Sequence, residues 1–494
     1  MEGFMQIIKN INDAINGFVW GVPMLVMLVG TGILMTVLTH FFQVRNIGHW
    51  WSSTVGKIFT DKEVTEHTAA HDRQITQFQS LCTALAATIG TGNIAGVSAA
   101  IVSGGPGAIF WMWIVAFFGM MTNFSENVLG IFYRRKNENG EWSGGAMYYL
   151  RDGLGAKPGC AVIGTVLAVL FSCFCVLASF GIGNMSQINS IAANLKSAFS
   201  ISPVITGVIL MGLAGLVIVG GLKRIASVTE KLVPFMAIAY VIGALAIVIS
   251  HAGNIIPSLV LIFKGAFAMK AVGGGIIGSG VKMAVQWGMK RGVFSNEAGL
   301  GSSVMVHSGS NVKEPVIQGM WGIFEVFADT IVVCTLTAMS ILCSGLVDLT
   351  SGEVLTQSQS TAMVAEAFST TFGGFGAKFI AIAILLFAFS TVLGWSQYGT
   401  KAFEYLFGTK AVKVYQVIFV AFIMVGATMD LSLAWELSDT FNGLMAIPNL
   451  IGVLVLAPTV MKITDNYIAR VFRHEDQRPM YSAFADVQEA QEKA

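Results

Sequence analysis

The amino-acid sequence predicts an all-α polytopic membrane protein with eleven transmembrane helices. Three observations lead to this fold class. Of the 494 residues, 54% are hydrophobic and 12% are charged, whereas about 25% of the residues in a soluble domain are charged. Several apolar stretches exceed the roughly 18 residues that mark a membrane-spanning helix, and the mean hydropathy is +0.70. Lys and Arg residues gather in alternate loops between these stretches.

The predicted spans follow one another along the chain. Their bounds are 20–42, 80–104, 107–133, 160–195, 203–220, 232–250, 271–290, 317–343, 377–398, 414–430 and 440–461. The apolar stretch at 254–263 is too short to cross a bilayer, so we expect a re-entrant or interfacial segment there. The acidic tail after His474 is expected to be disordered, because so charged a segment buries too little apolar surface to fold.

Basic residues orient the chain in the membrane. With the N-terminus outside, the cytoplasmic segments are 43–79, 134–159, 221–231, 290–316, 399–413 and the tail after 461. The basic residues left on the outer side are then Lys9, Lys196, Lys264, Lys270 and Lys378. This asymmetry is typical of a helical membrane protein, whose cytoplasmic loops carry the excess of Lys and Arg. We therefore expect the C-terminus in the cytoplasm.

The chain divides into five predicted regions. They are an extra N-terminal transmembrane helix (1–43), a cytoplasmic linker (44–79), two repeats (80–250 and 271–461) and a cytoplasmic tail (462–494). The two repeats each hold five spans and cross the membrane in opposite senses. The leading helix of each repeat is interrupted by glycines, and interruptions at matching places in two inverted halves point to a transporter binding site.

The first interruption is Gly90-Thr91-Gly92-Asn93. Backbone at membrane depth must be hydrogen-bonded within its helix unless it faces protein or a polar cavity, and two glycines favour unwinding. The Thr hydroxyl and the Asn amide add ligand atoms where carbonyls come free, and half-helix ends attract an anion or a cation. We predict a site for a small polar solute or a cation; the alternative is a helix packed through small residues.

The second interruption is expected in the run Gly273–Gly280, with unwinding at Gly278-Ser279-Gly280 and a hydroxyl supplied by Ser279. The polar stretch Arg291–Ser303 would then lie at the cytoplasmic end of this helix. Its side chains form either a gate or an ordinary capping turn.

Two other spans carry candidate site residues. In the fourth, Phe180 and Gln187 lie on one helical face, and because amides are costly against lipid this face turns inward, to contact the solute or to join helices. In the ninth, Ser390 and Thr391 precede Trp395. The hydroxyls either bond back to the preceding turn or provide hard oxygen ligands for Na⁺, and Trp395 either lines an apolar pocket or only packs.

Charged residues inside the spans are functional candidates. Glu325 and Asp329 share a helical face and are expected to face Lys282, as an internal ion pair or as a proton relay. The sequence contains neither a catalytic cluster nor a metal-spaced His group. Its net charge of +1 gives no reason to expect a nucleic-acid partner. The six cysteines are expected to be buried free thiols. A passive channel would need a symmetric filter or rings of charged residues, and neither is visible in this sequence.

Three strings are specific to one family. They are G-T-G-N-I-A-G at Gly90–Gly96, G-G-A-M-Y-Y-L at Gly144–Leu150 and R-G-V-F-S-N-E-A-G-L-G-S at Arg291–Ser302. Together they resemble the alanine-or-glycine:cation symporters of prokaryotes, over residues 75–465. The resemblance implies a leucine-transporter-type fold, a five-plus-five inverted repeat with one extra helix ahead of it.

The resemblance also implies the binding residues. The substrate carboxylate would lie on amides of the first interruption, and one sodium ion would be held there by Thr88 and Asn93. A second sodium site would use carbonyls and hydroxyls of Ala86, Ile89, Ser390 and Thr391. The substrate-binding set is Gly90, Thr91, Gly92, Asn93, Phe180, Gln187, Ser279, Met283, Thr391 and Trp395.

We therefore expect Na⁺-coupled symport of alanine or glycine into the cell by alternating access, in a prokaryotic cytoplasmic membrane and by a functional monomer. Because the sodium sites of this fold have no obligatory carboxylate, the substrate's own carboxylate would complete one of them. The alternatives are a carrier of the same fold that is proton-coupled through Glu325 and Asp329, or one that transports glutamine.

Overall fold

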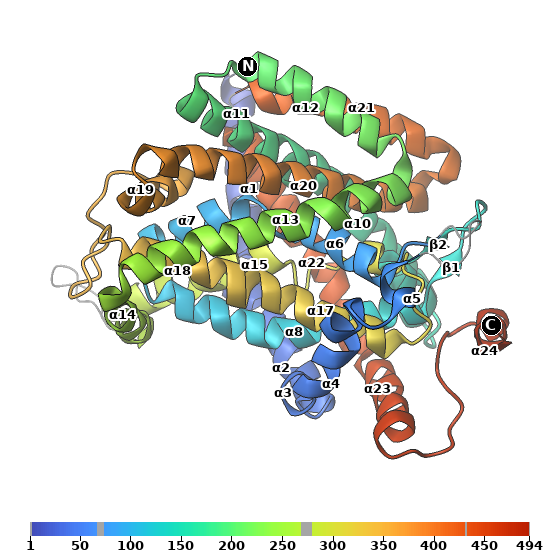
Figure 1. Ribbon diagram of the computed structural model, residues 1–494. Coiled ribbons are helices and arrows are strands. Elements are labelled where there is room, and N and C mark those ends of the chain that lie inside the picture. Colours follow the sequence, from blue (N-terminus) through green and yellow to red (C-terminus); the bar gives the residue numbers. More distant parts are fainter. Residues whose placement is uncertain (1, 67–73, 268–278, 430–431, 494) are drawn as a thin grey trace.

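The structure is a computed structural model that describes residues 2–66, 74–267, 279–429 and 432–493 (Figure 1). Within these residues the helices and turns are joined by loops, and the only strands longer than a single bridge are β1 (Arg135–Lys136) and β2 (Trp142–Ser143), which pair antiparallel as a hairpin. The predicted all-α fold class is confirmed.

Seven helices of the described residues are long and apolar enough to cross a membrane, or up to nine if each of two bent pairs is a single span. Two shorter helices, α12 (Pro203–Ile218) and α15 (Ser279–Asn296), lie at the remaining predicted spans. The eleven predicted spans are therefore consistent with the structure.

The N-terminal part forms α1 (Glu2–Val19), which packs on α22 (Ser432–Val455), and α2 (Val22–Leu38), which packs on α8 (Ala108–Phe132). Short helices follow in the predicted linker. They are α3 (Phe42–Arg45), α4 (Ile47–Trp51), the π-helical turn η1 (Ser52–Gly56) and α5 (Lys62–Thr65).

The predicted first repeat begins with α6 (Gln77–Thr88), whose start is fixed by reciprocal hydrogen bonds between Thr76 and Gln79. Its other helices are η2 (Gly92–Gly96), α7 (Val97–Gly104), α8 (Ala108–Phe132), α9 (Ala146–Tyr148), η3 (Tyr149–Leu154), α10 (Ala161–Phe180), η4 (Gly181–Met185), α11 (Ser186–Phe199), α12 and α13 (Gly221–Ser250).

The rest of the chain contains α14 (Ile255–Phe267), α15, α16 (Val304–His307), α17 (Pro315–Val326), η6 (Phe327–Cys334), α18 (Thr335–Cys343), α19 (Ser360–Phe372), α20 (Gly374–Phe407), α21 (Val412–Thr428), α22 (Ser432–Val455), α23 (Ala457–Phe472) and α24 (Ala485–Lys493). Figure 1 shows α13, α20, α17 and α8 running alongside one another across the molecule. The broken helix α6–α7 lies within this bundle, against α13 and α20.

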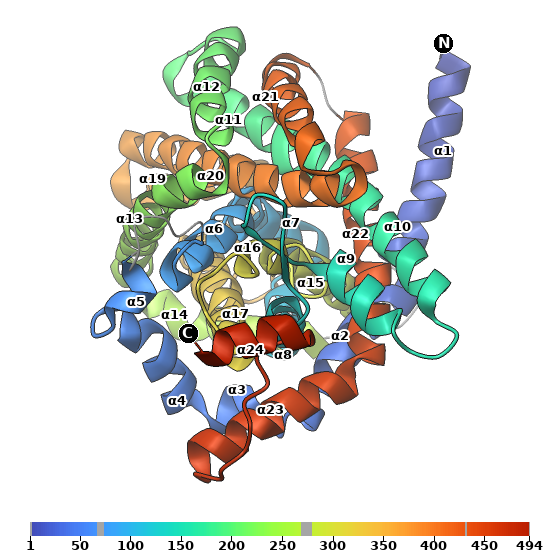
Figure 2. The same cartoon turned by 90° about the vertical axis from the view of Figure 1, so that its right-hand side faces the viewer.

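The tail is ordered, so the prediction of disorder after His474 is wrong. The helix α24 lies across one end of the bundle (Figure 2). The Ala483 amide donates to the Phe132 carbonyl at 2.9 Å, and the Arg135 guanidinium lies 3.4 Å from the centre of the Phe484 ring. Composition alone misses this outcome because the folded tail binds the end of α8 instead of building a core of its own.

Candidate functional site

The first interruption lies where the sequence places it. Helix α6 ends at Thr88, and the chain restarts as a π-helical turn at Gly92 and continues as α7, bent by 51° from α6. Side chains satisfy the freed backbone: the Gly90 amide donates to Asn93 Oδ1 at 2.9 Å and the Thr91 amide to Gln187 Oε1 at 3.4 Å. The second bond is longer than an ordinary N–H···O bond, so the Thr91 amide is weakly held.

The structure shows a second interruption further along the chain than the run Gly273–Gly280, where the sequence analysis expected one. Residues Gly273–Gly278 lie outside the described residues, and Ser279 and Gly280 are helical, within α15 (Ser279–Asn296). The helix stops at Asn296, and Glu297, Gly299 and Gly301 have positive φ angles before α16 begins at Val304. The chain therefore breaks within the string S-N-E-A-G-L-G, which the sequence analysis had taken for a gate or a capping turn.

The two interruptions lie against each other. A Cβ atom added to Gly92 would lie 3.2 Å from Phe294 Cδ1 and 3.5 Å from Ser295 Cα, both at the end of α15. A Cβ atom added to Gly90 would lie 2.4 Å from Thr391 Oγ1 of α20. Only glycine permits so close an approach at Gly90, and the glycines therefore bring α15 and α20 onto the break.

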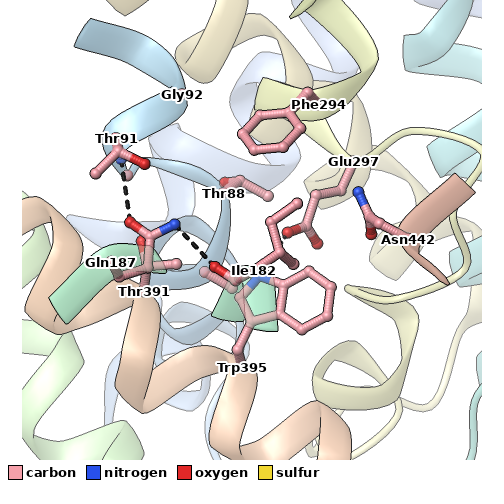
Figure 3. Close-up of a pocket in the computed structure, with 12 residues that line it drawn as sticks. Thr88, Thr91, Gly92, Ile182, Gln187, Phe294, Glu297, Thr391, Trp395 and Asn442 are labelled. Carbon is pink, nitrogen blue, oxygen red and sulfur yellow. Dashed lines mark hydrogen bonds between the residues drawn. The ribbon is translucent and has the colours of Figure 1, made fainter. Parts of the chain in front are cut away.

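A buried pocket lies where these elements meet (Figure 3). Its lining residues are Ala87, Thr88, Gly90, Thr91, Gly92, Ile182, Gln187, Phe294, Glu297, Thr391, Trp395 and Asn442. The cavity volume is about 20 Å³, which is room for about one water molecule. A solute must therefore displace side chains to bind, because the pocket is contracted in this structure.

Glu297 supplies the carboxylate of the pocket wall. Its side chain is 4% exposed and accepts hydrogen bonds from Trp395 Nε1 at 2.9 Å and from Ser302 Oγ at 2.5 Å. In Figure 3 its carboxylate and the Trp395 indole lie on the side of the pocket opposite Thr91. The pocket thus has backbone amides at one end and a carboxylate at the other.

Asn93 does not line this pocket. Its amide nitrogen donates to Asp329 Oδ1 at 2.6 Å, while its oxygen accepts from the Gly90 amide. Asp329 lies on η6, in the middle of the helix that runs from α17 to α18. The break is therefore tied to a buried carboxylate, a contact that the sequence analysis did not predict.

Ser390 and Thr391 both lie against the first break. Thr391 lines the pocket, and the Ser390 hydroxyl donates to the Phe387 carbonyl at 2.8 Å and to the Ala86 carbonyl at 3.4 Å. Thr391 also bonds back to the Phe387 carbonyl, at 2.9 Å. These hydroxyls therefore bond back within α20, as the first alternative expects, and Ser390 also reaches the Ala86 carbonyl. Their role as Na⁺ ligands stays a prediction.

Three predicted site residues lie elsewhere. The Phe180 ring packs against Tyr415, Phe419 and Phe422, with ring centres 5.0–5.8 Å apart, because its helix changes to a π-helical turn at Gly181 and the face it shares with Gln187 is shifted. Met283 is 44% exposed on α15. Ser279 begins that helix, 15 residues before Phe294, or about 22 Å at 1.5 Å per residue. The break between α15 and α16 follows Asn296, well beyond Ser279 and Met283, and neither residue lines the pocket.

The expected facing of Lys282 toward Glu325 and Asp329 is also wrong. Lys282 is exposed and lines an apolar groove beside Val26 and Ile33 of α2. Glu325 instead bonds His307 Nε2 at 2.9 Å.

The sequence analysis missed five pocket residues: Ala87, Ile182, Phe294, Glu297 and Asn442. The signal for Phe294 and Glu297 was present, because G-L-G at Gly299–Gly301 resembles the G-T-G of the first break. The longer glycine run upstream drew the prediction away from it. Ile182 and Asn442 carry no local sequence signal.

Four buried carboxylates hold the segment between Ser295 and His307. Glu126 accepts from the Gly301 amide at 3.2 Å, Glu297 from Ser302, Glu325 from His307 and Asp329 from Ser295 Oγ at 2.8 Å. Each is at most 4% exposed. Of these four carboxylates, only Glu325 has a basic partner within ion-pair distance among the described residues. The second break is therefore fixed mainly by neutral donors bonded to carboxylates.

Two interrupted helices that meet around a buried polar pocket in an apolar helical bundle define a secondary membrane transporter. The model of the sodium:alanine symporter family matches residues 5–482. The chain belongs to this family, whose members are multi-pass amino-acid transporters and not enzymes.

Individual relatives extend over nearly the whole chain. The "Sodium/alanine symporter AgcS" of Methanococcus maripaludis is 45% identical over 452 residues, which cover 92% of this chain and 95% of that protein. The "Probable sodium/glutamine symporter GlnT" of Bacillus subtilis is 35% identical over 467 residues, which cover 94% of this chain and 91% of that protein.

A solved structure of a Na⁺-coupled sialic acid symporter in a substrate-bound outward-open state has a TM-score of 0.54 at 11% identity and covers 96% of both chains. This likeness shows the fold alone, which is of the leucine-transporter type.

Proposed function

We propose that this protein is a Na⁺-coupled symporter that carries alanine or glycine into the cell by alternating access. One observation supports this most strongly: the two breaks meet at a pocket that has amide donors at one end and the Glu297 carboxylate at the other. A zwitterion has complementary groups at its two ends.

The substrate carboxylate binds the amides of Thr91 and Gly92. These amides begin the second half of the broken helix, and a helix N-terminus favours an anion. The Thr91 amide donates a long hydrogen bond to Gln187 Oε1 (3.4 Å), and the substrate carboxylate replaces Gln187 as the acceptor.

The substrate ammonium group binds Glu297, since this is the carboxylate of the pocket wall. Ile182, Phe294 and Trp395 then enclose the side chain. These apolar walls stand close together around the contracted cavity, so a methyl group or a hydrogen is the favoured side chain.

Sodium ions bind beside the break at two sites. One uses Thr88 and Asn93, and the other uses the carbonyls of Ala86 and Ile89 with the hydroxyls of Ser390 and Thr391. The bond from Ser390 Oγ to the Ala86 carbonyl supports the second site, because both oxygens already face the same space.

Ion and substrate are coupled because both stabilise the same arrangement of the break. Such linkage is reciprocal: Na⁺ raises the affinity for alanine by the factor by which alanine raises the affinity for Na⁺. The two repeats then rock around the site and expose it to either side in turn.

The protein works as a monomer in the prokaryotic cytoplasmic membrane, with its N-terminus outside and its C-terminus in the cytoplasm.

Glutamine is the second candidate substrate, because GlnT of Bacillus subtilis, which bears a sodium/glutamine symporter name, is 35% identical to this chain. Competition of unlabelled glutamine with labelled alanine uptake distinguishes the two.

The experiment compares wild-type protein with Asn93→Ala in proteoliposomes loaded with choline chloride and diluted into NaCl. Labelled alanine should accumulate inside wild-type proteoliposomes. Its uptake should be abolished in the variant, which removes both the Gly90 cap and a Na⁺ ligand. Uptake by Asn93→Ala at the wild-type level with unchanged Na⁺ dependence would contradict the proposed site.

A further inference from the structure

Asp329 is a buried carboxylate beside the first break, outside the set of residues that line the pocket. It is 0% exposed. Its carboxylate accepts hydrogen bonds from Asn93 Nδ2 at 2.6 Å, Ser295 Oγ at 2.8 Å and Thr330 Oγ1 at 2.7 Å. These donors are neutral, and in the described part of the chain no Lys, Arg or His forms an ion pair with Asp329.

An ionised carboxylate in such a place is costly unless a positive charge compensates it. Neutral hydrogen bonds stabilise the anion, but they leave its net charge in the membrane interior. Glu325, which lies one helical turn earlier, has the His307 imidazole at 2.9 Å, a partner that is positively charged when it is protonated. Asp329 has no such partner among the described residues, so either a bound proton or a cation from outside the chain compensates its charge.

The atoms around Asp329 form an oxygen-rich ligand set. The hydroxyl oxygens of Ser295 and Thr330 lie 2.7–2.8 Å from one carboxylate oxygen, Oδ2, and a hydroxyl can turn from donating a proton to offering a lone pair. Asn93 contacts Asp329 through its amide nitrogen and also carries an amide oxygen, which accepts from the Gly90 amide at 2.9 Å. Carboxylate, hydroxyl and amide oxygens are the ligands that hard cations prefer.

The set is also held in place by a second layer of contacts. Asn296 Nδ2 donates to Thr330 Oγ1 at 3.1 Å, and Cys334 Sγ lies 3.4 Å from Asn93 Nδ2 and 3.2 Å from Ser295 Oγ. The four oxygen-bearing residues come from the first break, the end of α15 and η6. A cation here would join these three elements.

We propose that the coupling Na⁺ at the first break binds to the Asp329 carboxylate together with Ser295, Thr330 and Asn93. This inference rests on the proposed Na⁺-coupled symport. The fixed carboxylate replaces the substrate's carboxylate as the counter-charge of the ion. Na⁺ therefore binds to the substrate-free protein, and the substrate follows.

The test measures binding of radioactive Na⁺ to purified protein in the absence of any amino acid, and Na⁺-dependent alanine uptake by the same preparations. Wild type should show saturable Na⁺ binding without substrate. Asp329→Asn keeps the shape and removes the charge, and should raise the half-saturating Na⁺ concentration about tenfold or more, because ligand charge sets cation affinity. Ser340→Ala is the matched control: it deletes a buried hydroxyl of the same helix that bonds only to the Leu336 carbonyl at 2.8 Å.

The outcomes separate the two proposals. In one outcome, the wild type shows Na⁺-driven uptake and the half-saturating Na⁺ concentration of Asp329→Asn stays within about twofold of the wild-type value. This outcome overturns the Asp329 site and leaves the symport intact. Wild-type uptake that ignores Na⁺ overturns the proposed function itself. If Asp329→Asn does not yield a monodisperse protein, Ser295→Ala and Thr330→Val decide: each should weaken Na⁺ binding severalfold, and unchanged binding in both refutes the site.

Discussion

The Asn93 side-chain amide donates a 2.6 Å hydrogen bond to the Asp329 carboxylate and its oxygen accepts from the Gly90 amide at 2.9 Å. One side chain thus caps the broken end of α6 and connects it to the π-helical turn between α17 and α18. A change of charge or ligand at Asp329 is thereby passed directly to the backbone that faces the pocket.

Gly90→Ala should inactivate transport. A Cβ atom there would lie 2.4 Å from Thr391 Oγ1, and such overpacking costs about 1–3 kcal/mol, so we expect alanine uptake to fall about tenfold or more. Gly30→Ala on α2 is the matched control, since its Cβ atom would meet nothing within 4 Å. Equal uptake by the two variants would show that the close contact between the break and α20 is not needed.

Glu297→Gln should raise the half-saturating concentration of alanine. The change removes the proposed partner of the ammonium group, and a hydrogen bond to a charged group contributes about 1.5–3 kcal/mol, which corresponds to about 10-fold to 150-fold in affinity. Uptake is measured over a range of alanine concentrations at fixed saturating Na⁺. A variant with the wild-type alanine dependence would remove Glu297 from the substrate site.

Trp395→Phe should also weaken alanine binding, through Glu297. Phenylalanine keeps an aromatic wall but removes the indole N–H that donates to Glu297 at 2.9 Å, and a buried acceptor left without its donor costs about 1–3 kcal/mol. Trp113→Phe is the control, because it loses a similar 2.8 Å bond to Thr335 away from the pocket. If both variants shift the alanine dependence alike, the effect is one of general packing.

Ile182→Ala should broaden the substrate range. Removing part of the apolar wall leaves room for larger side chains, so unlabelled valine should compete with labelled alanine more strongly than it does in the wild type. The control is Phe180→Leu, whose ring packs on Tyr415 and Phe419 outside the pocket. A range that changes with Phe180 and not with Ile182 would place the side-chain pocket elsewhere.

Hydropathy and glycine pattern predicted most of the fold and the first half of the site. The break at Gly90–Asn93 was visible because two glycines interrupt an apolar stretch, and Gln187, Thr391 and Trp395 were found as polar or aromatic residues in such stretches. Those signals are local, and they survive in the structure as pocket residues.

The second half of the site was not predictable by the same means. The run Gly273–Gly280 has more glycines than the string around Gly299, so composition favoured it over the break that the structure shows between α15 and α16. Contacts such as Asn93 with Asp329, or Glu297 with Trp395, join residues about 100 or more positions apart. Only the packing of α15, α17 and α20 around α6 brings them together.

The central claim is that a Na⁺ gradient drives uphill alanine transport through this site. The most direct measurement is accumulation of labelled alanine in proteoliposomes under an inward Na⁺ gradient without a pH gradient, compared with an inward proton gradient without Na⁺. The account predicts accumulation above equilibrium in the first case only. Accumulation driven by the proton gradient alone, and unaffected by Na⁺, would contradict it.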